Sequence, residues 1–114
     1  MSLIPQSLRS QLLANGERQS AGDSRDPRPV VKLFTPDANA TWLLTELDPA
    51  DPDLAFGLCD LGLGCPELGY VRLSELETAR GPLGLKIERD YHFTADHTLS
   101  VYAADARVHC RIRA

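Results

Sequence analysis

The stretch LFTPDANATWLLTELDPADPDLAFGLCDLGLGCPELGYVRL, residues 33–73, decides the fold of this chain of 114 residues. Short runs of apolar, aromatic and β-branched residues alternate in it with clusters of proline, glycine, aspartate and asparagine. The runs are typical of β-strands, and the clusters are typical of turns, because proline fixes a turn dihedral and the short polar side chains bond to nearby backbone. The stretch therefore predicts a series of antiparallel strands joined by short connections.

The first two expected strands, residues 30–35 and 40–47, should form a hairpin with a loop of about four residues. The run DPADPD at 48–53 should be a turn, because its two prolines cannot donate to a strand ladder. Three further strands are expected, and Gly57 within the first of them should mark a bulge or a close approach of another backbone. These strands are placed at residues 54–61, 70–73 and 85–93.

Helices are expected before and after these strands. An amphipathic helix should cover residues 3–15 and stop at Asn15-Gly16, and a last helix should run from about 98 to 108. A short helix should begin at Ser74, with Ser74 and Glu77 forming a capping box, and stop at Gly81-Pro82. Residues 17–29 lack apolar periodicity and are expected to be a mobile loop. We therefore predict an α+β fold in a single domain, residues 1–114, with an antiparallel sheet of four or five strands covered by N- and C-terminal helices.

Composition is that of a soluble globular protein, with 43% hydrophobic and 25% charged residues. No run approaches the roughly 20 apolar residues of a membrane span, and the first ten residues lack the basic-then-apolar order of a signal peptide. We therefore expect a cytoplasmic protein without membrane contact. Three cysteines cannot all be paired, so a disulfide framework is not expected.

Acidic residues are concentrated in the middle of the chain. Residues 37–77 contain nine acidic and one basic side chain, a net charge of −8, whereas each flank has a net charge of +2. This segment disfavours direct binding to nucleic acid and suits a protein partner with a basic surface, although it could also serve solubility alone. The aromatic residues Trp42, Phe56 and Tyr70 lie in the same segment and could be core residues or binding anchors. The candidate partner-binding residues are Asp37, Glu46, Asp48, Asp51, Asp53, Asp60 and Glu67.

The sequence gives less support for a catalytic site or a metal site than for a protein-binding surface. Cys59, Cys65, His92 and His97 have the residue types of a zinc site, but the two cysteines lack the usual close spacing. Cys59 or Cys65 could be a nucleophile with either histidine as base and Asp60 as its orienting group, yet no activating motif surrounds either thiol.

Other ligand-binding motifs are incomplete. Asp48, Asp51 and Asp53 could bind calcium, but their spacing differs from that of an EF-hand loop. The glycines at 62–69 do not form a phosphate-binding motif, and the basic residues near the C-terminus lack flanking aromatic residues for nucleic acid. We therefore predict no cofactor and no catalytic residue.

The segments LFTPD, ATWLLTELDP, DPDLAFGLCDLGLG, PELGYVRLSEL and LGLKIERDYHF together resemble an uncharacterised family of small bacterial proteins, a domain of unknown function. The resemblance extends from the N-terminal helix to the last helix. The resemblance implies that this protein is similar in type to those encoded by accessory genes on plasmids and integrated elements. Such genes include those for antirestriction and anti-CRISPR inhibitors. The resemblance supplies no catalytic residue.

Our leading hypothesis is a non-enzymatic interaction protein of a mobile genetic element, an inhibitor of a host defence nuclease that acts through its acidic surface. The alternative is a small metal- or thiol-dependent hydrolase that uses Cys59, His92 and His97. A third possibility is a module that binds a peptide as an added strand at its sheet edge.

Overall fold

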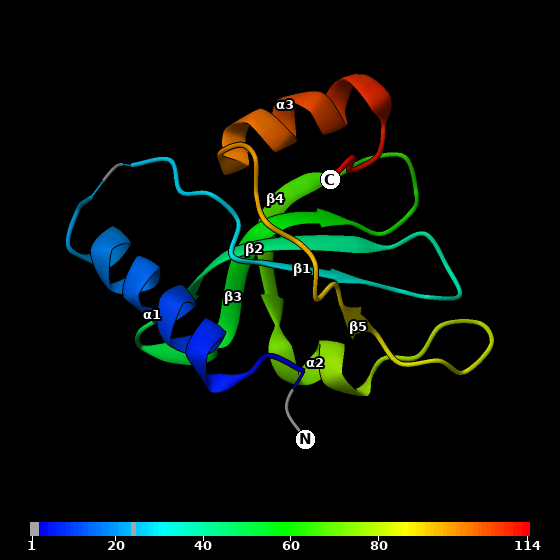
Figure 1. Ribbon diagram of the computed structural model, residues 1–114, viewed down its shortest axis with the longest axis horizontal. Coiled ribbons are helices and arrows are strands. Elements are labelled where there is room, and N and C mark those ends of the chain that lie inside the picture. The colour runs from blue at the N-terminus through cyan, green and yellow to red at the C-terminus, as the bar shows by residue number, and fades with distance from the viewer. Residues whose placement is uncertain (1–2, 24) are drawn as a thin grey trace.

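The computed structural model describes residues 3–23 and 25–114 of the chain (Figure 1). Its five strands form one antiparallel sheet in the order β4-β3-β2-β1-β5, so the predicted α+β fold is confirmed. The elements are α1 (Gln6–Ser20), β1 (Val31–Phe34), β2 (Thr41–Asp48), β3 (Asp51–Asp60), β4 (Glu67–Arg72), α2 (Leu73–Thr78), β5 (Glu88–Arg89) and α3 (Leu99–His109).

Helices cover both faces of the sheet. Each face of the sheet has its own cluster of buried side chains. One cluster lies between the sheet and the helices α1 and α2, and the other lies between the sheet and α3. Leu12, Trp42 and Leu44 belong to the first cluster, and Leu43 and Tyr102 belong to the second. Because Trp42 is only 5% exposed, it is a core residue and not a binding anchor. Among the described residues, no helix combines the length and the apolar character that crossing a membrane requires.

The two central hairpins follow the turn residues of the sequence. In the β1–β2 hairpin the Thr35 amide donates to the Ala40 carbonyl at 3.1 Å, which leaves a loop of four residues as predicted. The β2–β3 turn is shorter than expected, because Asp48 pairs with Asp51 across Pro49 and Ala50. Pro52 can lie in β3 because the register there is irregular and gives it no partner on β2.

The predicted bulge or close approach at Gly57 is confirmed. The register of β2 and β3 shifts between Leu44 and Glu46, so Thr45 is an extra residue without a partner on β3. A Cβ atom on Gly57 would lie 2.0 Å from the Leu43 carbonyl oxygen, so only glycine fits beside the bulged strand. The Thr45 carbonyl is turned toward α1, where it accepts a hydrogen bond from Asn15 Nδ2 at 2.8 Å.

The predicted end of the first helix at Asn15-Gly16 is wrong, because α1 continues to Ser20. Gly16 is an interior helix residue that lets α1 approach β2: a Cβ there would lie 1.7 Å from the Leu47 carbonyl oxygen. The expected loop at 17–29 therefore begins as helix. Its later part contacts α3, since the Leu99 amide donates to the Pro27 carbonyl at 2.8 Å.

The remaining differences concern short elements. β4 begins at Glu67 rather than at residue 70, and β5 contains only two residues. The capping box at Ser74 is wrong, because α2 begins at Leu73 and the Ser74 amide and hydroxyl donate to Asp53 at 2.9 and 2.7 Å. The Asp53 carboxylate, distant in sequence, thus accepts a hydrogen bond from an amide at the start of α2, where the Ser74–Glu77 capping box was expected.

Candidate functional site

An open cleft of about 370 Å³ lies where the C-terminal end of α1 meets the strands β2, β3 and β4. Its strand side presents two carboxylates and two aromatic rings, and its helix side is small and polar. The lining residues are Gly16, Gln19, Ser20, Glu46, Asp48, Pro49, Phe56 and Tyr70.

The bulge at Thr45 places Glu46 in this cleft. Trp42 and Leu44 face α1, and a regular strand would direct Glu46 to that same buried face. The extra residue reverses the alternation, so Leu47 joins the core beneath α1 and Glu46 lies opposite Phe56. Phe56 in turn lies opposite Tyr70, so three strands contribute one row of side chains to the cleft.

Glu46 is a half-buried carboxylate that forms no hydrogen bond or ion pair with any other described residue. Burial raises the pKa of Glu46, and the neighbouring negative charge of Asp48 raises it further. Both effects disfavour the ionised form, and a cation in the cleft would offset them by attracting the carboxylate. The cleft therefore has an electrostatic preference for a positively charged group.

The aromatic pair adds a second feature that suits a cation. The rings of Phe56 and Tyr70 meet edge to face, with centroids 5.0 Å apart and planes inclined by 62°. Tyr70 is 66% exposed, so much of its side chain is accessible to a ligand. Lysine and arginine side chains are attracted to aromatic ring faces, and their aliphatic stems pack on them. A basic side chain matches both the rings and the carboxylates.

Asp51 and Asp53 are placed beside the β2–β3 turn and are partly neutralised within the chain. Arg72 Nη1 lies 2.9 Å from an Asp51 oxygen and 3.7 Å from an Asp53 oxygen. The Ser74 hydroxyl, its amide and Arg72 together lower the pKa of Asp53 below its ordinary value. These carboxylates can still face a partner, but they carry less uncompensated charge than Glu46.

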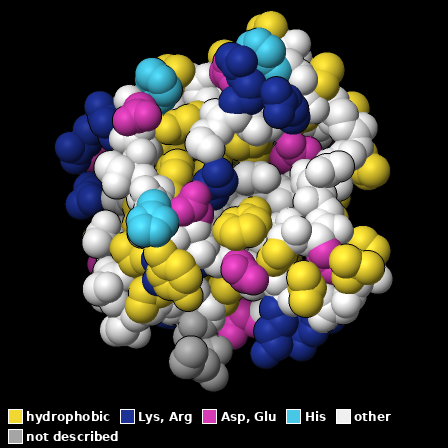
Figure 2. All heavy atoms as spheres, turned by 45° about the vertical axis from the view of Figure 1, so that its right-hand side comes forward, with side chains coloured by type: hydrophobic (Ala, Val, Ile, Leu, Met, Phe, Trp, Pro, Cys, Tyr) yellow, Lys and Arg dark blue, Asp and Glu magenta, His cyan; other side chains and the backbone are white. Residues whose placement is uncertain are grey.

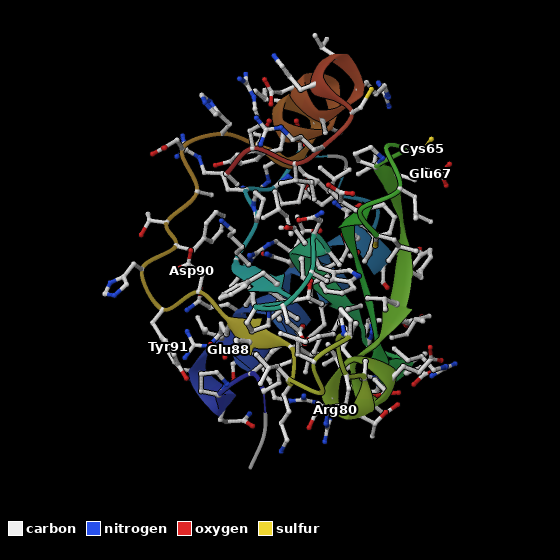
Figure 3. All side chains as sticks on the ribbon, turned by 90° about the vertical axis from the view of Figure 1, so that its right-hand side faces the viewer. Cys65, Glu67, Arg80, Glu88, Asp90 and Tyr91 are labelled. Atoms are coloured by element: carbon white, nitrogen blue, oxygen red, sulfur yellow. The ribbon has the colours of Figure 1, made fainter. Side chains whose placement is uncertain are left out.

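Two of the predicted acidic residues have structural contacts. Asp60 is 3% exposed and accepts hydrogen bonds from the Gly62 amide at 2.8 Å and the Ile112 amide at 3.0 Å. We therefore no longer propose Asp60 as a surface contact. Asp37 Oδ2 accepts from the amides of Leu83 and Leu85 and holds the 81–85 loop. Glu67 lies at the start of β4 and points away from the body of the protein (Figure 3).

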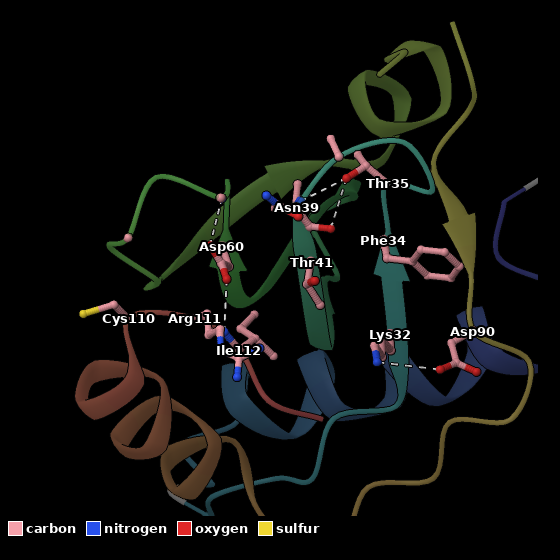
Figure 4. Close-up of a pocket in the computed structure, with 14 residues that line it drawn as sticks. Lys32, Phe34, Thr35, Asn39, Thr41, Asp60, Asp90, Cys110, Arg111 and Ile112 are labelled. Carbon is pink, nitrogen blue, oxygen red and sulfur yellow. Dashed lines mark hydrogen bonds and ion pairs between the residues drawn. The ribbon is translucent and has the colours of Figure 1, made fainter. Parts of the chain in front are cut away.

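A larger cleft of about 700 Å³ lies near the C-terminal tail, on the α3 side of the sheet (Figure 4). Three of its charged residues, Lys32, Asp60 and Asp90, have partners within the chain: Lys32 Nζ lies 2.7 Å from the Ala114 carbonyl oxygen and 3.7 Å from Asp90 Oδ2. Asp60 holds the tail through Ile112. We favour the smaller cleft, because its half-buried Glu46 has no partner among the described residues and lies in the same cleft as an aromatic pair.

Exposed apolar side chains elsewhere are dispersed. The face in Figure 2 carries hydrophobic side chains in several separate groups, with charged side chains between them. Leu83 and Leu63 are the most exposed of the large hydrophobic residues, at 79% and 81%, but each belongs to a loop. None of these groups combines an aromatic pair with unpaired charge as the cleft does.

The residues suggested for a thiol or zinc site are not brought together. Cys59 packs against the core beneath α1, whereas His97 contacts Tyr102 on the α3 side of the sheet. Burial raises the pKa of the Cys59 thiol, which is the opposite of nucleophile activation. Cys65 is exposed in the β3–β4 loop (Figure 3). Within residues 3–23 and 25–114, no three His, Cys, Asp or Glu side chains are grouped to hold one metal ion.

Sequence reasoning identified Glu46, Asp48, Phe56 and Tyr70 but could not group them into one site. The sequence did not predict that α1 lines the cleft, because Asn15-Gly16 has the pattern of a helix end. Gly57 is the residue that could have indicated this arrangement, because a glycine within a strand often lies beside a bulge in the neighbouring strand. A bulge in β2 reverses the faces that its following residues occupy.

Over residues 3–113 the chain matches the family described as protein of unknown function (DUF2958). The same comparisons give no match to a curated protein and none to a solved structure.

Proposed function

We propose that this chain, which belongs to the DUF2958 family of proteins of unknown function, is a non-enzymatic protein-interaction module that binds a basic surface. The observation that carries the proposal is the half-buried Glu46 carboxylate without a partner among the described residues, in the same cleft as the exposed Tyr70. A lysine or arginine side chain of the partner would enter this cleft. Its charge would meet Glu46 and Asp48, and its stem would lie on the aromatic pair.

The surrounding charge supports the same kind of partner. Residues 37–77 carry a net charge of −8, and Asp51, Asp53 and Glu67 contribute to it outside the cleft. A field of this sign speeds the approach of a basic surface and repels nucleic acid. The proposed contact set therefore has the cleft at its centre and these three carboxylates around it.

Our finer proposal is that the partner is a defence nuclease of the bacterial host, and that this protein of a mobile element blocks it in the cytoplasm. Nucleases of restriction and CRISPR systems bind nucleic acid through basic surfaces, which acidic side chains can occupy. The support is the charge of the central segment and the resemblance of the sequence motifs described above. A CRISPR component or a restriction enzyme would thus lose its substrate by competition.

The proposal is tested by affinity capture from a bacterial lysate with two variants of equal charge. Glu46→Lys/Asp48→Lys reverses the cleft, and Glu75→Lys/Glu77→Lys makes the same change in net charge on exposed positions of α2. Quantitative mass spectrometry compares the captured proteins with those of the wild type, after circular dichroism has shown that both variants are folded.

We expect a basic protein that is retained by the α2 variant and reduced at least tenfold with the cleft variant. Equal loss with both variants would show that net charge alone governs binding. Retention by both variants would show that the cleft does not bind the partner. Either result would overturn the proposed site.

A further inference from the structure

We infer that β4, an edge strand of the sheet, pairs with an extended segment of the basic partner, so that binding adds a sixth strand. This inference rests on the proposed function and names how the partner is held. It concerns the backbone of residues 67–72, whereas the proposal above concerns the side chains of the cleft.

The outer edge of β4 is regular and open. Its six residues pair with β3 in one continuous register, from Leu54 opposite Arg72 to Cys59 opposite Glu67, without a bulge. The strand order ends at β4, and none of its residues is buried. A strand of this length offers an edge of about 20 Å whose outward amides and carbonyls have no strand partner.

The strand β4 has one charged residue at each end, Glu67 and Arg72, and lacks the proline, lysine or bulge that often protects a sheet edge. Proteins block edges with proline, lysine, bulges or a covering element. The sequence ELGYVR contains neither proline nor lysine, and a Cβ on Gly69 would have no atom within 4 Å. The opposite edge differs, because β5 has only two residues and offers no comparable length. The strand β4 is thus the edge on which a partner can pair.

The side chains of β4 connect this edge to the cleft. Leu68 and Tyr70 are 43% and 66% exposed, and Tyr70 continues the row that Glu46 and Phe56 form across the sheet. In an added strand, the residue opposite Tyr70 would project on the same face. A basic side chain at that position would lie over the Tyr70 ring, and the basic side chain two residues away would pack its aliphatic stem on Leu68.

Charge favours a basic segment over a second copy of this chain. Pairing two copies through β4 would bring together two segments that each carry a net charge of −8. Glu46, two strands inward on the same face as Tyr70, and Glu67, at one end of β4, both add negative charge near the added strand, which favours positive side chains in it. The occupant to which we commit is therefore an extended segment with alternating basic and apolar residues.

The probe for this inference is the octapeptide VRVRVRVR with blocked ends, titrated into the full-length protein. The first control is VEVEVEVE. The second is VRVRVRVR with N-methyl groups on alternate amides, which keeps every side chain but cannot pair along one edge. Amide hydrogen exchange of residues 67–72 reports strand pairing, and the carboxyl carbon shift of Glu46 reports occupation of the cleft.

We expect VRVRVRVR to slow exchange of alternate β4 amides at least tenfold and to shift Glu46. The N-methylated peptide should bind at least tenfold more weakly, and Tyr70→Lys should weaken VRVRVRVR by a similar factor. If both basic peptides shift Glu46 equally and β4 exchange is unchanged, strand addition is wrong, whereas the proposal that the acidic cleft binds a basic side chain stands.

Two other results also overturn the inference. If neither basic peptide shifts Glu46 or protects β4, the proposed function fails with it. If β4 is already protected without peptide and sedimentation shows a dimer that dissociates on dilution, the edge is occupied by a second copy. Protection by VEVEVEVE equal to that by VRVRVRVR would remove the charge argument.

Discussion

Gly57 of β3 and Gly69 of β4 lie directly opposite each other in the sheet. A side chain at Gly57 would clash with the backbone of β2, whereas a side chain at Gly69 would extend into open space. A Cβ on Gly57 would lie 2.0 Å from the Leu43 carbonyl oxygen and 2.9 Å from the Leu44 Cα. A Cβ on Gly69 would meet no atom within 4 Å. The difference arises because the bulge at Thr45 brings the backbone of β2 close to β3 on one side only.

Gly57→Ala should therefore destabilise the protein by about 2 kcal/mol or more, since a new atom in a filled space forces backbone shifts. Gly69→Ala is the matched control, and it should leave the free energy of unfolding within about 0.5 kcal/mol of the wild type. Urea unfolding followed by tryptophan fluorescence measures both. Equal stabilities for the two variants would contradict the close approach at Gly57.

Asp60→Ala should reduce stability and release the C-terminal tail. The substitution leaves the amides of Gly62 and Ile112 without their acceptor, and a buried hydrogen bond to a charged group contributes about 1.5–3 kcal/mol. Thermal unfolding and hydrogen exchange at residues 111–114 check the two effects. Glu75→Ala is the control, because it removes an exposed carboxylate on α2, outside the tail. Unchanged exchange in the tail of the Asp60 variant would refute this role.

Glu46 should make the protein less stable as the pH rises from about 4 to 7. Its folded-state pKa is raised by burial, so the native state holds the proton to higher pH than the unfolded state does. The unfolded state then binds fewer protons in this window, and stability falls with rising pH. Glu46→Gln should remove that decrease and be more stable than the wild type at pH 7, with little difference near pH 4.

The control for this measurement is Glu67→Gln, which removes an exposed carboxylate on β4. Urea unfolding at several pH values between 4 and 7 gives the comparison. A wild type and a Glu46 variant with the same pH dependence would show that burial does not perturb this carboxyl group.

Cys59 should react with iodoacetamide far more slowly than the exposed Cys65 and Cys110 at pH 8. Burial raises the pKa of Cys59 and reduces its thiolate, the form that reacts. We expect a rate difference of roughly tenfold or more, measured by peptide mass spectrometry over time. Cys59 as the fastest of the three would revive a thiol-dependent activity.

The sequence was sufficient for those elements whose local residues and tertiary contacts agree. The β1–β2 hairpin has turn residues at Pro36–Asn39 and apolar strands on both sides, and it forms with the predicted loop. The last helix, predicted near 98–108, occupies Leu99–His109 and ends at Cys110 in a left-handed conformation with φ of 57°. These signals lie within each element.

Tertiary contacts decided the features that were missed. Gly16 is ordinarily a helix-ending residue, but here it lies against the Leu47 carbonyl and α1 continues past it. The Ser74 amide is satisfied by Asp53, 21 residues earlier in the chain, so its local capping signal has no effect. Residues distant in sequence supplied both contacts, and the sequence pattern around each site does not contain them.

The acidic residues of the site could be named from the sequence but not ranked. Asp60 and Glu46 look alike in a list of charges. Asp60 is 3% exposed with two amide donors, whereas Glu46 is half-buried and has no partner among residues 3–23 and 25–114. The extra residue at Thr45 determines the face on which Glu46 lies. A period-two pattern cannot show such a shift, because it assumes that the alternation is unbroken.

The titration of Glu46 with and without VRVRVRVR is the most direct measurement of whether the cleft binds a basic side chain. Its carboxyl carbon shift is followed by NMR from pH 3 to 8 in the free protein and with saturating peptide. We predict a raised pKa in the free protein that falls when the peptide is bound, because a nearby cation stabilises the ionised carboxylate. A Glu46 titration that is the same with and without bound peptide would show that the basic side chains do not enter the cleft.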